Sequence, residues 1–149
     1  MKAIIGVCLA ASLAIAATSA RAGVYADDLG KCLVSSTTEA DRALMVRWIF
    51  SAMSLNKEIA QYVQMSAEVR DKLNRDTAAL YMRLMTESCR AQTRDAAKYE
   101  GAPAIGSAFG LLGQVATQGL FSDPAVAASI SELDKYYDAQ KLKAVMDEK

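Results

Sequence analysis

Residues 36–50 have the sequence STTEADRALMVRWIF, and this stretch decides the fold class. Ser36 and Glu39 have the spacing of a capping box, in which the serine hydroxyl and the glutamate side chain each satisfy a free amide of the first turn. Apolar residues then recur at three- and four-residue intervals, as on a helix face turned toward a core: Leu44, Met45, Trp48, Ile49 and Ala52. The stretch therefore predicts a helix from about Ser36 to Ser54, with Trp48 as its largest core residue.

Helix-favouring residues also dominate the rest of the chain, and β-branched residues occur singly rather than in alternating runs. Further helix starts are indicated by residues that cap amides or take the first helical position: Asp27 with Asp28, Asn56, Ser66, and Asp123 before Pro124. Gly101 and Pro103 predict the end of a helix that can run unbroken from Ser66 to Tyr99. We therefore predict an all-α, compact single-domain helical bundle of about five helices with one disulfide.

The stretch from Gly101 to Ser122 contains no charged residue. A membrane span is one interpretation, but Ser107, Gln114, Thr117, Gln118 and four internal glycines make the stretch less apolar than lipid requires. A helix buried centrally in the bundle explains it better, and we expect Trp48 to pack against it. The spacing Gly106-x-x-x-Gly110, with Gly113 beyond, predicts close helix packing inside the molecule.

The first 22 residues have the pattern of an export signal. Lys2 precedes an apolar run from Ala3 to Ala17, and Ala20-Arg21-Ala22 is the small-x-small sequence after which signal peptidase cuts. The run is shorter than the roughly 20 residues that span a bilayer. We therefore predict a cleaved signal peptide over 1–22, a single helical domain over 23–149, a periplasmic or secreted location, and no stable membrane insertion after cleavage.

Two cysteines, Cys32 and Cys89, remain after the predicted cleavage. Outside a reducing cytoplasm two such thiols usually pair. A redox pair or a thiolate metal site is the alternative, but the chain has no Cys-x-x-Cys and no third soft ligand near either cysteine. We predict a structural disulfide that stabilises the fold by roughly 4 kcal/mol in the chain-entropy model.

Charge and composition exclude several classes of function. The chain has 17 basic and 17 acidic residues and no histidine; without Lys2 and Arg21 the mature part has 15 basic residues against 17 acidic. No basic cluster suits a nucleic acid. The absence of histidine removes the commonest general base and zinc ligand. Met82 and Met85 have a spacing that copper ligands also use, but core packing explains it better. We therefore expect no enzyme activity, no metal and no cofactor.

Charged residues offer two kinds of candidate site. The carboxylate pairs Asp27-Asp28 and Glu39-Asp41 could serve as acid and base only if burial shifted their proton affinities, and their places at helix starts favour capping. Asp41, Arg42 and Arg47 flank the Trp48 stripe and form a possible partner-binding surface. An ordinary solvated face is the alternative for these three.

The sequence around the second predicted helix also carries a resemblance. Cys32-Leu33-Val34, Thr37-Thr38, Asp41-Arg42 and Trp48-Ile49-Phe50 resemble a group of small exported bacterial helical proteins of unknown function. This resemblance covers about a fifth of the chain and implies no active site. In size, compartment and architecture, though in no matched motif, the chain is also similar to the periplasmic immunity proteins that block cell-wall amidases.

Three hypotheses of function follow. The first is a non-catalytic protein that binds another periplasmic protein, with an immunity protein as its sharper form. The second is a carrier of an apolar small molecule or lipid, with the uncharged helix and the methionines lining a cavity. An enzyme that relies on carboxylates alone is the third. The sequence leaves the partner and any homo-oligomer open.

Overall fold

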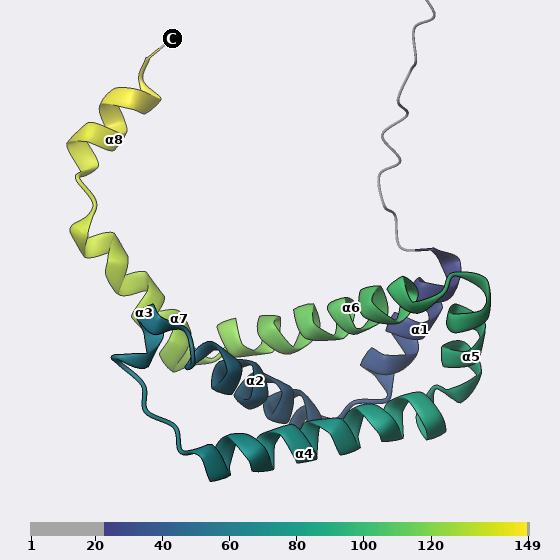
Figure 1. The fold of residues 1–149 in the computed structure, drawn as a ribbon. Helices are drawn as coiled ribbons and strands as arrows, with labels where there is room; N and C mark the ends of the chain where they lie inside the picture. Colours follow the sequence, from purple (N-terminus) through teal and green to yellow (C-terminus); the bar gives the residue numbers. More distant parts are fainter. Residues whose placement is uncertain (1–22, 149) are drawn as a thin grey trace, which may run out of the picture.

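A computed structural model describes residues 23–148, and the predicted signal peptide lies outside the described residues. Within this range the chain forms eight α-helices, one π-helical turn and one 3-10 helix, and no strand (Figure 1). In chain order they are α1 Val24–Ser35, α2 Glu39–Met53, α3 Lys57–Ala60, α4 Ala67–Arg83, η1 Leu84–Ser88, α5 Arg90–Tyr99, α6 Ala102–Phe121, α7 Pro124–Ser131, η2 Glu132–Tyr136 and α8 Ala139–Met146. The all-α prediction is confirmed, and the number of helices exceeds the five expected.

Local capping signals locate three helix starts correctly, but the predicted cap at Asp27 and Asp28 is wrong, because both lie inside α1, whose N-cap is Gly23. The side chain of Asn56 caps α3, that of Ser66 caps α4, and that of Asp123 caps α7 with Pro124 in the first turn. Gly101 has a positive φ of 78°, which only glycine adopts without strain, and it separates α5 from α6. These features depend on neighbours in the sequence, so the sequence contains the information that fixes them.

The capping box of α2 lies two residues later than predicted. Thr38 is the N-cap, and the box is completed by Asp41 rather than by Glu39. Ser36 instead ends α1, where its amide bonds the carbonyl of Cys32 at 2.9 Å. The Thr37 hydroxyl likewise donates to the Val34 carbonyl at 2.9 Å. Because these two residues bond back to the last turn of α1, α2 begins only after them.

The predicted helix over 66–99 is not continuous. The regular α-helix α4 is followed by the π-helical turn η1, where the amide of Cys89 donates to the carbonyl of Leu84 at 2.8 Å. The chain then changes direction and continues as α5 (Figure 1). Cys89 has φ −118° and ψ 32°, outside the helical region. The side chain of Cys89 is fully buried. This break adds one helix to the predicted number and lets α5 run beside α1.

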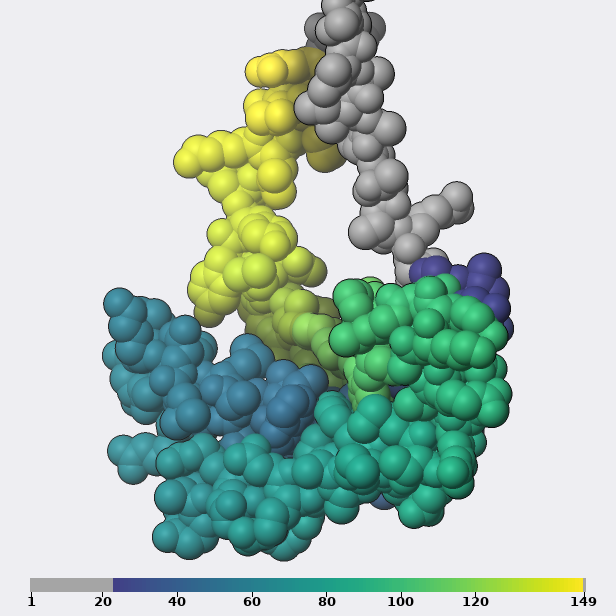
Figure 2. Space-filling view, turned by 45° about the vertical axis from the view of Figure 1, so that its right-hand side comes forward, coloured from purple at the N-terminus to yellow at the C-terminus, as the bar shows by residue number. Residues whose placement is uncertain are grey.

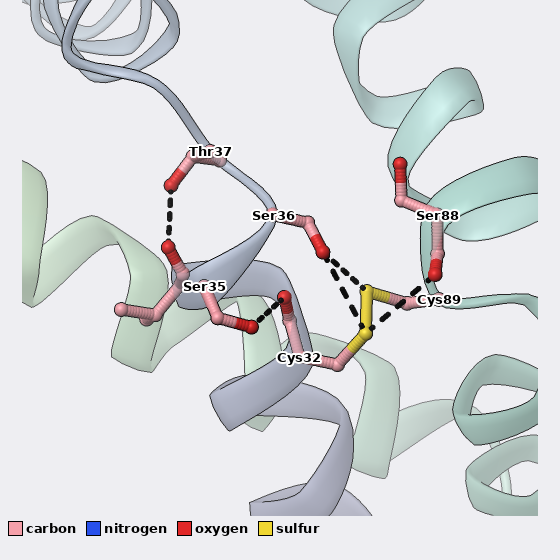
Figure 3. Close-up of a disulfide and its surroundings, with 7 residues drawn as sticks. Cys32, Ser35, Ser36, Thr37, Ser88 and Cys89 are labelled. Carbon is pink, nitrogen blue, oxygen red and sulfur yellow. Dashed lines mark hydrogen bonds between the residues drawn. A yellow bond between two sulfur atoms is a disulfide. The ribbon is translucent and has the colours of Figure 1, made fainter.

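The sulfur atoms of Cys32 and Cys89 lie at bonding distance, 2.11 Å, and their Cα atoms are 5.9 Å apart (Figure 3). The bond joins the last turns of α1 to the bend between η1 and α5. The hydroxyl of Ser36 lies 3.6 Å from the sulfur of Cys89. The predicted pairing therefore has the required geometry, and it ties α1 to the segment that breaks the long helix.

The core forms where α1 packs against α5 and α6. Leu29, Leu33, Met45, Leu84 and Leu112 are its largest fully buried side chains apart from Cys89. Close approach of α1 to α6 relies on small residues, because a Cβ on Gly30 would lie 2.9 Å from Leu111 Cδ2 and 3.6 Å from the Cα of Ala108. Glycine in the middle of α1 thus has a packing reason.

The uncharged helix α6 is not central in the bundle, contrary to the prediction. Only one face is buried, formed by Ala104, Ala108, Leu112 and Ala116 at four-residue intervals. A Cβ at Gly106, Gly110 or Gly113 would meet no atom within 4 Å. The expectation that these glycines provide tight internal packing is therefore wrong. Alanines and Gly30 do that instead.

Trp48 packs on α4 rather than against α6. Its ring meets Tyr81 edge-on with centroids 6.0 Å apart, and its indole Nε1 donates to Asn74 Oδ1 at 3.0 Å. Tyr81 in turn contacts Phe109 of α6, with centroids 4.5 Å apart. Trp48 is half-buried, since the indole N–H needs a polar partner at the surface. The predicted core position is wrong for this residue.

The segment after Asp123 stands off the body of the molecule (Figures 1 and 2). We call α7, η2 and α8 the C-terminal arm. None of its residues through Glu148 is buried, and the predicted inward residues Ile130, Leu133 and Tyr137 are each more than half exposed. The fold is therefore less compact than predicted, and the single domain over 23–149 stays a prediction.

Candidate functional site

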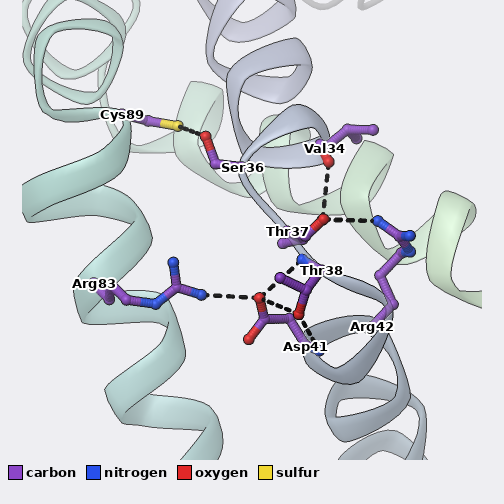
Figure 4. A network of polar contacts seen from close by, with 8 residues as sticks. All are labelled: Val34, Ser36, Thr37, Thr38, Asp41, Arg42, Arg83 and Cys89. Carbon is purple, nitrogen blue, oxygen red and sulfur yellow. Dashed lines mark hydrogen bonds and ion pairs between the residues drawn. The ribbon is translucent and has the colours of Figure 1, made fainter.

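Asp41, the first predicted contact residue, is held within the protein's own network at the start of α2 (Figure 4). Its Oδ2 accepts from the amide and the hydroxyl of Thr38, each at 2.9 Å. The same oxygen accepts from Arg83 Nη2 at 2.9 Å, an ion pair that joins α2 to α4. Asp41 therefore fixes the relative position of two helices.

The pKa of Asp41 reflects this network. Partial burial raises the pKa, but hydrogen bonds from the Thr38 amide and hydroxyl, together with the guanidinium of Arg83, outweigh burial and hold it below the ordinary value. The carboxyl is thus ionised at neutral pH and its charge is already paired. It does not have the raised pKa that a general acid requires.

Arg42 lies on the other side of α2 from Arg83 (Figure 4). Its Nη1 donates to the carbonyl of Thr37 at 2.9 Å and to the Thr37 hydroxyl at 3.3 Å. The guanidinium has five N–H groups, so these two bonds hold the side chain in place and leave donors for another group. Arg42 is half-buried, and Arg47 is exposed.

Arg42 and Arg47 line the same cleft, which lies between α2 and the C-terminal end of α6 and has a volume of about 330 Å³. We call it the α2–α6 cleft. Its lining residues are Glu39, Arg42, Ala43, Val46, Arg47, Ala116, Gly119, Leu120 and Asp123. Asp41 is not among them. Two of the three predicted contact residues are thus brought together, and the third serves the scaffold.

The α2–α6 cleft is lined by charged residues of both signs and by apolar residues. Two arginines come from α2, while Glu39 and Asp123 supply carboxylates at the helix starts. Val46, Ala116 and Leu120 provide the apolar part. Large apolar side chains continue beyond it on the same helices, where Phe50 and Phe121 are about half exposed. Such a mixture suits a protein surface better than a polyanion.

Sequence reasoning missed the α6 side of the cleft, namely Ala116, Gly119, Leu120 and Asp123. A signal was present in the pair Leu120-Phe121 directly before Asp123-Pro124, because two large apolar residues at a helix end have no local partner. The prediction that α6 is buried all round removed that signal. The missing information was which face of α6 would be covered.

Three further predictions concern metal binding, the packing of the methionines and insertion into a membrane. Residues 23–148 contain no cluster of three or more acidic, cysteine or histidine side chains that converge as metal ligands would. Met82 is 55% exposed, so its predicted core packing is wrong. No helix among these residues combines the length and the apolar character that crossing a bilayer requires.

Comparisons of the chain with protein-family models, with curated proteins and with solved structures find no match.

Proposed function

We propose that this chain is an exported periplasmic protein that works without catalysis, by binding another protein through the α2–α6 cleft. The observation that carries the proposal is the pair Arg42 and Arg47, which line one cleft beside exposed apolar side chains. Arginine and aromatic residues are the types most enriched at binding hot spots.

The charges of the cleft indicate the chemistry of the partner. Arg47 is exposed and forms no ion pair within residues 23–148, so its guanidinium is available for a carboxylate. Arg42 is preorganised by Thr37, which lowers the entropy cost of a further contact. We infer a partner that presents an apolar side chain flanked by carboxylates.

An immunity protein is the sharper form of this proposal. A protein that blocks the active site of an exported cell-wall amidase needs export, a rigid scaffold and a contact surface, and it needs no catalytic group of its own. The Cys32–Cys89 bond and the Asp41–Arg83 pair hold α1, α2 and α4 in fixed positions. A gene for a secreted amidase next to this one would support the sharper form.

The alternative is a carrier of an apolar small molecule. The volume of the α2–α6 cleft, about 330 Å³, reaches the lower end of the range of ligand pockets. Against the carrier, the cleft contains two arginines and two carboxylates, and no methionine lines it. The exposed glycine face of α6 also encloses no cavity.

Site-specific photocrosslinking in the periplasm tests the proposal. A crosslinking amino acid at Leu120, inside the cleft, should give one discrete protein adduct, and the same group at Ala79 on the exposed side of α4 should give none. Arg47→Glu in the Leu120 background should suppress the adduct. Equal adducts at both positions, or a lipid adduct at Leu120, would contradict a protein partner in this cleft.

A further inference from the structure

The carboxylate of Glu100 caps the N-terminus of α1, although it lies 75 positions after Tyr25 in the chain. Glu100 Oε1 accepts from the Tyr25 amide and Oε2 accepts from the Ala26 amide, each at 3.0 Å. The N-cap residue Gly23 has no side chain to do this. Gly101, with φ 78°, turns the chain directly after Glu100, and Tyr25 stacks on Tyr99 with ring centroids 4.8 Å apart.

Gly23 lies directly against this carboxylate. A Cβ built on Gly23 would be 2.1 Å from Glu100 Oε1 and 2.5 Å from Oε2, so no other residue fits without displacing the cap. The nitrogen of Gly23 is attached to the same Cα by a bond of about 1.46 Å. This nitrogen is therefore within about 5 Å of a carboxylate, which is the range of a direct or slightly adjusted ion pair.

We propose that Glu100 is the binding site for the new N-terminus that signal cleavage creates. Signal peptidase adds water across the Ala22–Gly23 peptide bond, so the C–N bond breaks, Ala22 leaves with a carboxylate, and the Gly23 nitrogen takes up protons to become an ammonium. The ammonium then pairs with Glu100. This inference rests on the proposed export and on cleavage after Ala22.

The dipole of α1 explains why a carboxylate is needed beside the new N-terminus. A positive charge at the N-terminus of a helix is unfavourable, because the free amides there already carry partial positive charge. The Gly23 ammonium would therefore destabilise α1 unless a carboxylate offset it. Among residues 23–148, none of the ion pairs involves Glu100, and the neighbouring Lys98 lies over the ring of Tyr99 at 4.8 Å. The Glu100 carboxylate thus accepts hydrogen bonds from the amides of α1 and pairs with the new ammonium group.

Cleavage would in this way stabilise the mature fold. Before cleavage the Gly23 nitrogen is a neutral amide, and after it the same atom carries a charge beside Glu100. Among residues 23–148 the buried core lies wholly within 26–116, so a chain that begins at Gly23 retains all of these core residues. We expect the processed chain to be more stable than a chain with residues in front of Gly23.

The test first establishes the N-terminus and then measures coupling. Mass spectrometry of the exported protein should show Gly23 as the first residue; another start would refute the cleavage, independently of partner binding. Four purified chains then begin either at Gly23 or with two alanines before Gly23, and carry either Glu100 or Glu100→Gln. Urea unfolding at pH 7 gives the folding constant of each.

With Glu100 present, the two added alanines should lower the folding constant about two- to fivefold, the size expected for a partly screened ion pair. With Glu100→Gln they should leave the constant unchanged or raise it, because they move an uncompensated ammonium away from α1. The same decrease in both backgrounds would overturn the proposal. If Glu100→Gln does not fold, Glu100→Asp replaces it, and a shorter carboxylate should reduce the effect of the alanines; an undiminished effect would contradict the pairing.

Discussion

Asp41 of α2 and Arg83 of α4 form an ion pair at 2.9 Å that connects residues 42 positions apart. The same carboxylate completes the capping box of α2. One side chain therefore fixes both where α2 begins and how it lies against α4. This relationship assigns Asp41 to the scaffold and leaves Arg42 and Arg47 to face the α2–α6 cleft.

Asp41→Asn should destabilise the protein by about 1 to 2 kcal/mol, because a charged cap and a cross-helix pair are both weakened. The folded-state pKa of Asp41 is lowered, so its contribution is present above the unfolded value of about 4 and is lost as pH falls through the folded value. Urea unfolding of wild type and variant from pH 7 to pH 2 checks this. A stability difference that persists unchanged at the lowest pH would contradict the role of the charge.

Cys32 and Cys89 should contain no free thiol in protein freshly isolated after export. Replacing both by serine should cost roughly 4 kcal/mol, since the unfolded chain regains the freedom of the loop that the bond closes. Thiol titration of the unfolded, unreduced protein and urea unfolding of the double variant measure the two effects. Two titratable thiols per chain would show that the bond does not form.

Trp48 should contribute through its bond to Asn74 as well as through contact with Tyr81. Trp48→Phe removes the indole N–H and should cost about 1 kcal/mol. Asn74→Ala should cost a similar amount, and the two changes together should cost less than their sum because they remove the same bond. Fully additive effects in this double-mutant cycle would argue against the Trp48–Asn74 bond.

Removal of the C-terminal arm should leave the body folded. A chain that ends at Asp123 loses none of the residues that are buried within 23–148, so its unfolding free energy should change by less than about 1 kcal/mol. Thermal unfolding followed by helical circular dichroism tests this. Loss of the cooperative transition would show that the arm packs on the body in solution.

Helix boundaries set by neighbouring residues were predictable from the sequence, whereas features set by contacts between distant segments mostly were not. Asn56, Ser66, Asp123 and Gly101 mark helix boundaries through contacts with near neighbours, and these predictions hold. The break at Cys89 was not predictable from apolar spacing, because it depends on a bond to Cys32 and on the course of α5 beside α1.

The same limit applies to the candidate site. Arg42 and Arg47 were identifiable because they flank an apolar stripe on one helix. The opposite wall, from Ala116 to Asp123, depends on which face of α6 packs against α1. The close packing of Gly30 against Ala108 and Leu111 determines which face of α6 is buried. Because α6 is uncharged on every face, the sequence has no polar periodicity that would indicate this face.

A charge-reversal test of the cleft needs an arginine whose replacement changes binding without changing stability. Arg42→Glu would also break the bonds to Thr37, so it changes stability as well as binding. Arg47 is exposed and forms no such bond within the described range, 23–148. Arg90, exposed on α5 and without an ion pair among residues 23–148, is the matched control for a general effect of charge.

The most direct test of the α2–α6 cleft is quantitative recovery of the crosslinked partner by affinity purification of the exported protein. We predict that Arg47→Glu lowers the recovered partner at least tenfold, and that Arg90→Glu leaves recovery within twofold of wild type; both variants should keep the wild-type melting temperature within about 2 °C. Undiminished recovery with Arg47→Glu, or an equal loss with Arg90→Glu, would contradict binding through this cleft.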